Sequence, residues 1–585
     1  MPADKKSLYN FIFIALLFLL IFLLQYTFRS ADDNRLTSWQ WTFAHMDLMW
    51  FIPLLILGII FAYLLSISPF YKSRPALFLF IISFGLSAIF WSEPEVIVDT
   101  SRYFTQAKHL EIYGIRYFFQ EWGREIFAWT DTPLVSFIYG VIFRFSGESR
   151  AYIQIFTTFL FSMTVVLTFY TGKILWDEET GFSAGALLLG IPYLFSQVPL
   201  MLTDVPTMFF LTLSIYTFCK AVEKGGIWIV LASLAVFSAV FSKYSTWMML
   251  SVLPVIWVVY LITCRGNPQW LPSSRGGRGA GTGACPYRRG ISVAVIAGAL
   301  VAAATLLKFD VISQQIKFLQ EYQAPGLKRW GESFVSTFLF QVHPLITLAA
   351  LYSVYEAVKR RDLKYVIICW LILLVIVFQI KRSRYVMVVF PMLTLMASYG
   401  LQKIRIAGTR RFIIFGVIFS ALAVAIFSYL PFLQKNSMVN IKSAGEFLDS
   451  AEPGRVRVFT IPSSETSVNL AVAVPVLDLY LENEIYYQDA AAYSLPYDGI
   501  NTSPLRFTWE FKTPRYYDNP PLKKGGQGGF SEQSEAIAVI SNGHVKALPD
   551  YIEKELKGYS KSKDFDTSEG IFGFRPFVTV YLPEK

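Results

Sequence analysis

Cysteine, histidine and charged residues are all scarce in this chain of 585 residues. It has four cysteines and four histidines, and the cysteines show neither a disulfide framework nor a metal-type spacing. Only 16% of the residues are charged, whereas 54% are hydrophobic and 17% are aromatic. A soluble protein of this length would expose far too much apolar surface, so the composition excludes a soluble enzyme and predicts a membrane protein.

Long apolar runs recur along most of the chain, each close to the length that a helix needs to cross about 30 Å of hydrocarbon. We expect a mainly α-helical, polytopic membrane protein with about 13 transmembrane helices. The first run follows two lysines, but it is long and lacks a small-residue cleavage site, which favours a membrane anchor over a signal peptide. The expected spans are residues 8–28, 48–70, 76–92, 151–172, 181–198, 205–221, 227–242, 246–264, 291–307, 334–357, 364–380, 385–402 and 411–431.

The basic residues gather in alternate loops between these spans. With the N-terminus in the cytoplasm, almost all basic loops fall on the cytoplasmic side, as the positive-inside rule predicts. The net charge of +10 therefore reflects short loops and does not point to nucleic-acid binding. We expect a multi-pass protein of the cell (inner) membrane, in contact with membrane lipids. An odd number of spans leaves residues 432–585 outside.

This pattern divides the chain into a transmembrane domain, residues 1–431, and an extracytoplasmic domain, residues 432–585. Short alternating runs at 456–461, 536–540 and 578–582, with helical patterns at 444–448 and 552–556, predict a small α/β fold for the second. Two long outer loops cover 93–150 and 308–333. Within the first loop, Pro133 to Phe145 is apolar but shorter than the roughly 17 residues of a span, which predicts a half-inserted or surface helix.

Two aspartates, Asp99 and Asp204, lie just outside apolar spans on the predicted outer side. Carboxylates beside a bilayer are costly and usually functional, although each could simply cap the helix that it opens. Their common side favours a catalytic site. Arg102 and Tyr103, which follow the first aspartate, and His109 are added as candidate substrate-binding residues, although a lone interfacial histidine is usually structural.

A cluster of cations, Lys381, Arg382 and Arg384, precedes Tyr385 on the outer side, where the positive-inside rule disfavours it. The cluster could anchor the neighbouring helices at the interface. We favour a site for an anionic lipid headgroup, because arginine side chains hold phosphate with paired hydrogen bonds. These four residues are therefore candidate substrate-binding residues.

Five short motifs occur in a fixed order within residues 76–430, and their order and spacing resemble the GT-C membrane glycosyltransferases. The resemblance is strongest to the dolichyl-phosphate-mannose–protein mannosyltransferases of family 39, a group that includes the lipid A aminoarabinose transferases. Two departures are Thr100, where the family often has a second acid, and Asp131-Thr132, where a His or Lys often precedes proline. The motifs are Asp99 with Tyr103, the segment 132–147, Leu202-Thr203-Asp204-Val205-Pro206, Ser242-Lys243-Tyr244, and Lys381 with Arg384-Tyr385 and Pro391.

The resemblance implies transfer of a sugar, with inversion, from a polyprenyl-phosphate donor to a protein, lipid or glycan acceptor at the outer face. Asp99 would deprotonate or position the acceptor hydroxyl. Lys381 and Arg384 would stabilise the phosphate leaving group, and Asp204 would orient the acceptor or the cations. No cofactor or metal site is implied, although two aspartates could hold one divalent cation.

Two other functions stay open. A transporter or lipid flippase would call for inverted repeats and ionisable residues near the middle of the membrane, whereas here no repeat is clear and the acids lie at span ends. The departures at Thr100 and Asp131 leave room for a non-catalytic assembly subunit of the same fold.

Overall fold

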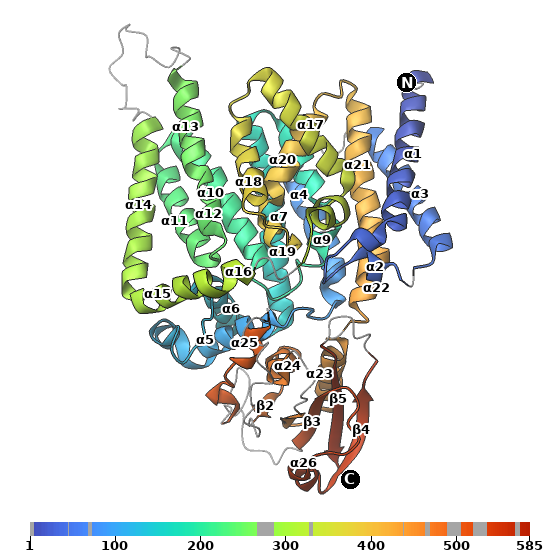
Figure 1. The fold of residues 1–585 in the computed structure, drawn as a ribbon, viewed down its shortest axis with the longest axis vertical. Helices are drawn as coiled ribbons and strands as arrows, with labels where there is room; N and C mark the ends of the chain where they lie inside the picture. Colours follow the sequence, from blue (N-terminus) through green and yellow to red (C-terminus); the bar gives the residue numbers. More distant parts are fainter. Residues whose placement is uncertain are drawn as a thin grey trace.

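Helices make up most of the described residues, and a five-stranded sheet lies near the C-terminus. The computed structural model describes residues 5–44, 46–67, 73–265, 286–326, 331–436, 438–461, 468–487, 503, 505–518, 535–567 and 574–584. Figure 1 shows a helical body with the N-terminus at one end and the sheet beyond the opposite end.

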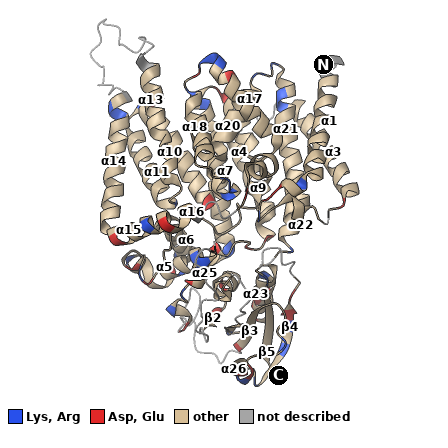
Figure 2. Cartoon of the chain, viewed as in Figure 1, with Lys and Arg blue, Asp and Glu red and all other residues tan. Residues whose placement is uncertain are grey.

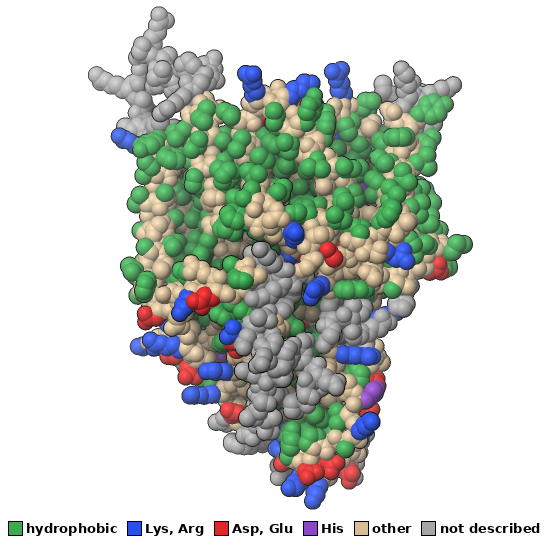
Figure 3. All heavy atoms as spheres, viewed as in Figure 1, with side chains coloured by type: hydrophobic (Ala, Val, Ile, Leu, Met, Phe, Trp, Pro, Cys, Tyr) green, Lys and Arg blue, Asp and Glu red, His purple; other side chains and the backbone are tan. Residues whose placement is uncertain are grey.

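Most of the apolar runs predicted as spans form helices, but those at 181–198 and 334–357 are interrupted; the second breaks at the extended residues Val342 and His343, between a helical turn at Ser336–Gln341 and α17. Within the described residues, nine helical segments are long and apolar enough to cross a membrane. Figure 3 shows a broad band of hydrophobic side chains between two charged ends, as expected for a chain that crosses the bilayer several times. The prediction of a mainly α-helical, multi-pass membrane protein is confirmed. The helices of this body include α1 (Lys5–Thr27), α3 (Leu48–Ile67), α4 (Pro75–Ala88), α7 (Arg150–Leu175), α10 (Asp204–Lys224), α11 (Ile227–Ser242), α12 (Thr246–Met249), α13 (Val252–Arg265), α14 (Pro286–Leu307), α17 (Pro344–Arg360), α18 (Tyr365–Val377), α20 (Phe390–Leu401), α21 (Ala407–Val424) and α22 (Leu430–Leu433).

The run expected to span at 181–198 is not one continuous helix. It forms α8 (Glu178–Leu188) and the short α9 (Pro192–Phe195), separated by a break at Gly190. With 11 residues, α8 is only about 16 Å long. The break lies inside the protein, since residues 189–198 are all buried, and irregular backbone at membrane depth requires such shelter.

Close packing holds this broken segment against its neighbours. A Cβ atom placed on Gly172 of α7 would lie 2.6 Å from the Cα atom of Gly181 on α8. The absence of side chains at both positions therefore allows the two helices to approach closely, as small residues do in membrane proteins.

The first outer loop folds into two helices, α5 (Asp99–Glu121) and α6 (Pro133–Ser146), which pack on each other. In Figure 1 both lie at the end of the helical body that faces the sheet, beside α15 (Phe309–Phe318) from the second outer loop. The predicted helix at Pro133 to Phe145 forms, and its 14 residues make about 21 Å, less than the thickness of the hydrocarbon. Gly114, with φ +85°, interrupts the regular geometry of α5.

The C-terminal part has the predicted α/β fold. The sheet order is β2-β1-β3-β5-β4, in which β1 pairs in parallel with β2 and β3, while β5 is antiparallel to β3 and β4. The three predicted strands correspond to β1 (Arg455–Ile461), β3 (Glu535–Asn542) and β5 (Pro576–Pro583), and the two predicted helices to α23 (Val439–Ala451) and α26 (Asp550–Glu555). The structure adds β2 (Glu484–Tyr487) and β4 (Tyr559–Phe565). The domain boundary at 431–432 stays a prediction.

Candidate active site

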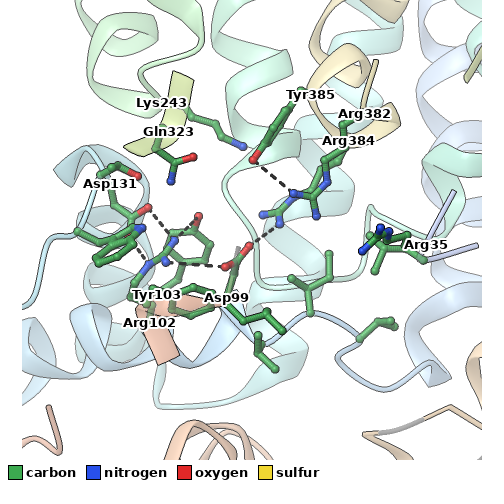
Figure 4. A pocket seen from close by; sticks show the side chains of 18 of the residues that line it. Arg35, Asp99, Arg102, Tyr103, Asp131, Lys243, Gln323, Arg382, Arg384 and Tyr385 are labelled. Atoms are coloured by element: carbon green, nitrogen blue, oxygen red, sulfur yellow. Dashed lines mark hydrogen bonds and ion pairs between the residues drawn. The ribbon is translucent and has the colours of Figure 1, made fainter. Parts of the chain in front are cut away.

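A cavity of about 220 Å³ lies where the helical body meets the C-terminal part. Figure 2 shows that charges of both signs gather in this region, away from the basic side chains at the end of the helical body where the N-terminus of the chain lies. Segments far apart in the sequence contribute to the cavity: the start of α5, the turn after α11, the segment that follows α15, the short helix α19 (Ser383–Val386) and the C-terminal part. Its lining includes Arg35, Asp99, Arg102, Tyr103, Trp129, Asp131, Lys243, Tyr322, Gln323, Arg382, Arg384, Tyr385, Leu505 and Phe507 (Figure 4).

Arg384 joins the two predicted catalytic aspartates. Its Nε donates to Asp204 Oδ2 at 2.7 Å, and its Nη1 donates to Asp99 Oδ2. The other oxygen of Asp204 accepts from Lys243 Nζ at 2.6 Å. Asp99 and Asp204, about a hundred residues apart in sequence, are therefore brought to the two sides of one guanidinium group.

A second arginine extends the row on the other side of Asp99. Arg102 holds Asp131 with both arms of its fork, at 2.6 Å from Nε and 3.0 Å from Nη2. Its Nη1 lies 3.8 Å from Asp99 Oδ1. Cations and anions thus alternate through six side chains, which we call the charged row: Lys243, Asp204, Arg384, Asp99, Arg102 and Asp131.

Neither aspartate caps its helix. Asp99 and Asp204 are the first residues of α5 and α10, while Val98 and Thr203 occupy the capping positions without a side-chain capping bond. Both carboxylates lie at the positive ends of helix dipoles and are directed to cations instead of to backbone N–H groups. This geometry favours a site over the capping alternative.

The acids of the charged row differ in exposure. The side chain of Asp99 is 18% exposed, whereas Asp204 is 1% and Asp131 is 8% exposed. Burial by itself would raise the pKa of Asp99, but the guanidinium groups of Arg384 and Arg102 outweigh it and hold this pKa below its usual value. Asp99 is therefore an ionised carboxylate, and of the three it is the one that a substrate reaches most easily.

Two other predicted residues, Arg382 and Tyr385, also line the cavity. Arg382 Nη1 donates to the Tyr385 hydroxyl at 3.3 Å, and its Nε lies 3.9 Å from Glu332 Oε1. Glu332 also accepts from the Ser383 backbone N–H at 2.8 Å, which fixes the start of α19. In Figure 4, Arg382 and Arg384 lie on the same side of Asp99.

Two of the predicted substrate-binding residues lie outside the cavity lining. Lys381 is exposed, and its backbone carbonyl accepts from the Thr337 hydroxyl at 2.9 Å. His109 is buried on α5, with its Nδ1 2.7 Å from the Thr105 carbonyl and its ring 5.1 Å from that of Tyr516. Burial lowers the pKa of His109 to about 4, so its ring is neutral.

The structure also places residues that we did not select from the sequence: Lys243, Asp131 and Arg35 line the cavity, and Glu332 lies beside Arg382. Lys243 stands in a motif that supported the resemblance, and Asp131 was noted only as a departure from the family pattern. The other two had no signal in the sequence. Within the described part of the chain, no group of three or more His, Cys, Asp or Glu side chains is placed to hold a metal ion. That the protein needs no cofactor or metal ion stays a prediction.

Comparisons with known proteins bear on the fold and the family. The family model described as dolichyl-phosphate-mannose–protein mannosyltransferase matches residues 130–275, a minority of the chain. No curated protein matches. Among solved structures, ArnT from Cupriavidus metallidurans bound to undecaprenyl phosphate shares 12% identity, covers 88% of this chain and 98% of that chain, and has a TM-score of 0.50.

Two further solved structures are more distant. The apo state of the same ArnT shares 11% identity over 86% of this chain and 97% of that one, with a TM-score of 0.48. An Archaeoglobus fulgidus oligosaccharyltransferase tethered with an acceptor peptide shares 11% identity over 72% and 64%, with a TM-score of 0.43. The family-model match and the likeness to the first ArnT structure confirm the resemblance found in the sequence: the chain has the GT-C fold of membrane glycosyltransferases.

Proposed function

We propose that this protein is an integral membrane glycosyltransferase that moves a sugar, with inversion, from a polyprenyl-phosphate donor to an acceptor at the outer face of the membrane. The observation that carries the proposal is the charged row, in which an accessible carboxylate, Asp99, lies between two arginines at a cavity. The solved ArnT structure of the same fold holds undecaprenyl phosphate, which favours a polyprenyl phosphate as the carrier of the donor.

The cations on one side of Asp99 fit the donor phosphate. Arg384, Lys243 and Arg382 line the cavity from α19 and from the turn after α11. Arginine forks and lysine ammonium groups are the side chains that most often bind phosphate in proteins. Fixed cations at the phosphate stabilise the charge that develops on the leaving group, and this lowers the barrier without reorganisation during the reaction.

Asp99 then receives the proton of the acceptor. The acceptor oxygen attacks the anomeric carbon from the side opposite the phosphate, and the bond from that carbon to the phosphate oxygen breaks. The electron pair leaves with the polyprenyl phosphate, and the acceptor proton passes to the Asp99 carboxylate. With two arginines beside it Asp99 is a weak base, so a phosphate that draws the charge of Arg384 away would make Asp99 a stronger one.

The orientation follows from the charge pattern. With the N-terminus in the cytoplasm, the C-terminal part and the cavity lie on the outer side, and the chain belongs in the cell (inner) membrane. The basic residues at the opposite end of the helical body, such as Lys359-Arg360-Arg361 at the end of α17, support this arrangement. A protease that cuts only the C-terminal part in intact cells with a permeable outer layer would test it.

Transfer of a radiolabelled sugar from polyprenyl phosphate, measured with membranes that contain the protein, tests the function. We expect Asp99→Asn to abolish transfer while the protein still accumulates in the membrane. The matched control is Asp564→Asn, at an exposed carboxylate of β4 far from the charged row in sequence, which should keep full activity. Full activity in Asp99→Asn would remove Asp99 from the mechanism. Donor binding without transfer by the wild-type protein would favour a non-catalytic subunit, and movement of the intact lipid across the bilayer would favour a flippase.

A further inference from the structure

The cavity has a second half that the donor chemistry does not use. Phe507 of α25 (Arg506–Trp509), in the C-terminal part, lies with its ring 4.7 Å from the Arg102 guanidinium carbon. Trp129, two residues before Asp131, and Tyr322 line the same cavity. Because Arg102 and Asp131 end the charged row on the side away from Arg384, these rings lie on the opposite side of Asp99 from the proposed phosphate site.

The rings form one connected cluster from three distant parts of the chain. The Trp129 ring centroid lies 5.8 Å from that of Tyr322 and 6.3 Å from that of Phe507. Tyr322 is fixed by its hydroxyl, which donates to the Ser503 carbonyl of the C-terminal part. Phe318, 4.4 Å from Trp129, supports the indole but does not line the cavity.

Trp129 is held in a conformation that costs free energy. Its φ is +50°, in the left-handed region that a bulky residue rarely adopts. Such strain persists where the surrounding structure requires it, and it is concentrated at ligand-binding sites. The strained backbone and the half-buried indole together indicate that the structure holds this side chain in place at the wall of the cavity.

The groups beside the rings are polar. Thr130, Asp131 and Gln323 line the cavity next to Trp129 and Tyr322, and Figure 4 shows Gln323, Asp131 and Arg102 together on one side of Asp99. Aromatic faces with hydrogen-bonding groups around them match a sugar ring, which has an apolar C–H face and a rim of hydroxyls. A polyprenyl chain offers these polar groups no hydrogen bonds.

We propose that Trp129, Tyr322 and Phe507 form a saccharide subsite, so that the hydroxyl whose proton Asp99 accepts is carried by a sugar ring. This proposal rests on the proposed function and adds the class of acceptor. The proposal depends on the rings and the polar groups around them, which fit a sugar ring.

Saturation-transfer NMR on the full chain in lipid nanodiscs tests the subsite directly. The probes are the methyl glycosides of glucose, galactose, mannose and N-acetylglucosamine, and a short peptide rich in Ser and Thr. We expect saturation transfer from the protein to at least one glycoside, which shows that this glycoside binds. Its affinity should fall about tenfold in Trp129→Ala and be retained in Trp129→Phe, which keeps a ring. Phe145→Leu, which removes an exposed ring at the end of α6 outside the cavity lining, is the matched control and should bind as the wild type does.

The outcomes separate this proposal from the proposed function. Binding of the peptide alone, binding of no glycoside, or equal loss in Trp129→Ala and Phe145→Leu would overturn the saccharide subsite. Because this assay measures binding and not transfer, it stays readable if Asp99→Asn retains activity. Conversely, radiolabelled transfer that depends on Asp99 while the wild type ignores every glycoside would leave the proposed function standing and remove the subsite.

Discussion

Substitutions of Arg384 should separate the effect of its charge from the effect of its hydrogen-bonding geometry. Its planar guanidinium reaches Asp204 through Nε and Asp99 through Nη1 at the same time. A lysine supplies the same charge from a single nitrogen and does not reproduce this fork. We therefore expect Arg384→Lys to keep a cation beside Asp204 and to lose the contact that orients Asp99 and, in the proposed mechanism, one arm on the phosphate.

The size of the effect follows from the bond that is lost. A hydrogen bond to a charged group contributes about 1.5–3 kcal/mol. If that bond is made in the transition state, its loss lowers the transfer rate about 10- to 150-fold. Arg384→Met removes the positive charge altogether, so that Asp99 and Asp204 both lose their contact with a cation at this position. Because the arginine side chain is only 3% exposed, this break should destabilise the protein by about 3–5 kcal/mol.

Transfer from radiolabelled polyprenyl-phosphate sugar, with the protein amount measured in the same membranes, is the assay for this pair. The matched control is Arg410→Lys, at another buried arginine, which pairs with Glu179 and donates to the Ile404 carbonyl at 3.0 Å, outside the cavity lining. Arg410→Lys should leave transfer unchanged. Activity of Arg384→Lys within about twofold of the wild type would refute the argument that the fork geometry matters.

Two further predictions concern pH and stability. A carboxylate with a lowered pKa stays ionised until the pH falls through that pKa. Burial raises the pKa of Asp99, but the charges of Arg384 and Arg102 outweigh it and lower this pKa below its usual value. Protonation of Asp99 should therefore cause no decline in transfer between about pH 7 and pH 5. A pH profile whose acid limb lies near neutrality and shifts in Asp99→Glu would contradict this. Lys108, buried 2.6 Å from Asp478 and 3.1 Å from Glu148, ties α5 to the C-terminal part, so Lys108→Met should destabilise the fold by about 3–5 kcal/mol. Lys561→Met, at a pair whose lysine is 55% exposed, should cost less than about 1 kcal/mol, and equal unfolding temperatures for the two variants would refute the difference.

The sequence predicted the helical body well because each span carries its own signal, a long apolar run. The broken span at 181–198 was missed, although Pro192 within the run marks a place where a helix is interrupted. In the C-terminal part, β4 was missed because most of its residues are exposed and polar, so that it lacks the alternation of a half-buried strand.

The candidate site was only partly predictable. Asp99 and Asp204 stood out because carboxylates beside a bilayer are costly, and Arg384 because the positive-inside rule disfavours a cluster of cations on the outer side. The direction of a side chain did not follow from the sequence: of two cations only three residues apart, Arg384 lines the cavity and Lys381 is exposed. Arg384 lies on α19, whereas Lys381 precedes the extended residue Arg382 at which that helix begins. Lys243 and Asp131 gain their importance from partners on other elements, and such pairs appear only when the chain is folded.

A cryo-electron microscopy structure of the full chain in nanodiscs with polyprenyl phosphate tests the central claim most directly. The account predicts that the phosphate lies within hydrogen-bonding distance of Arg384 and Lys243, with Asp99 facing the space beside it. A phosphate bound at the opposite end of the helices, or one that leaves the contacts of Arg384 with Asp99 and Asp204 unchanged and touches neither cation, would contradict it.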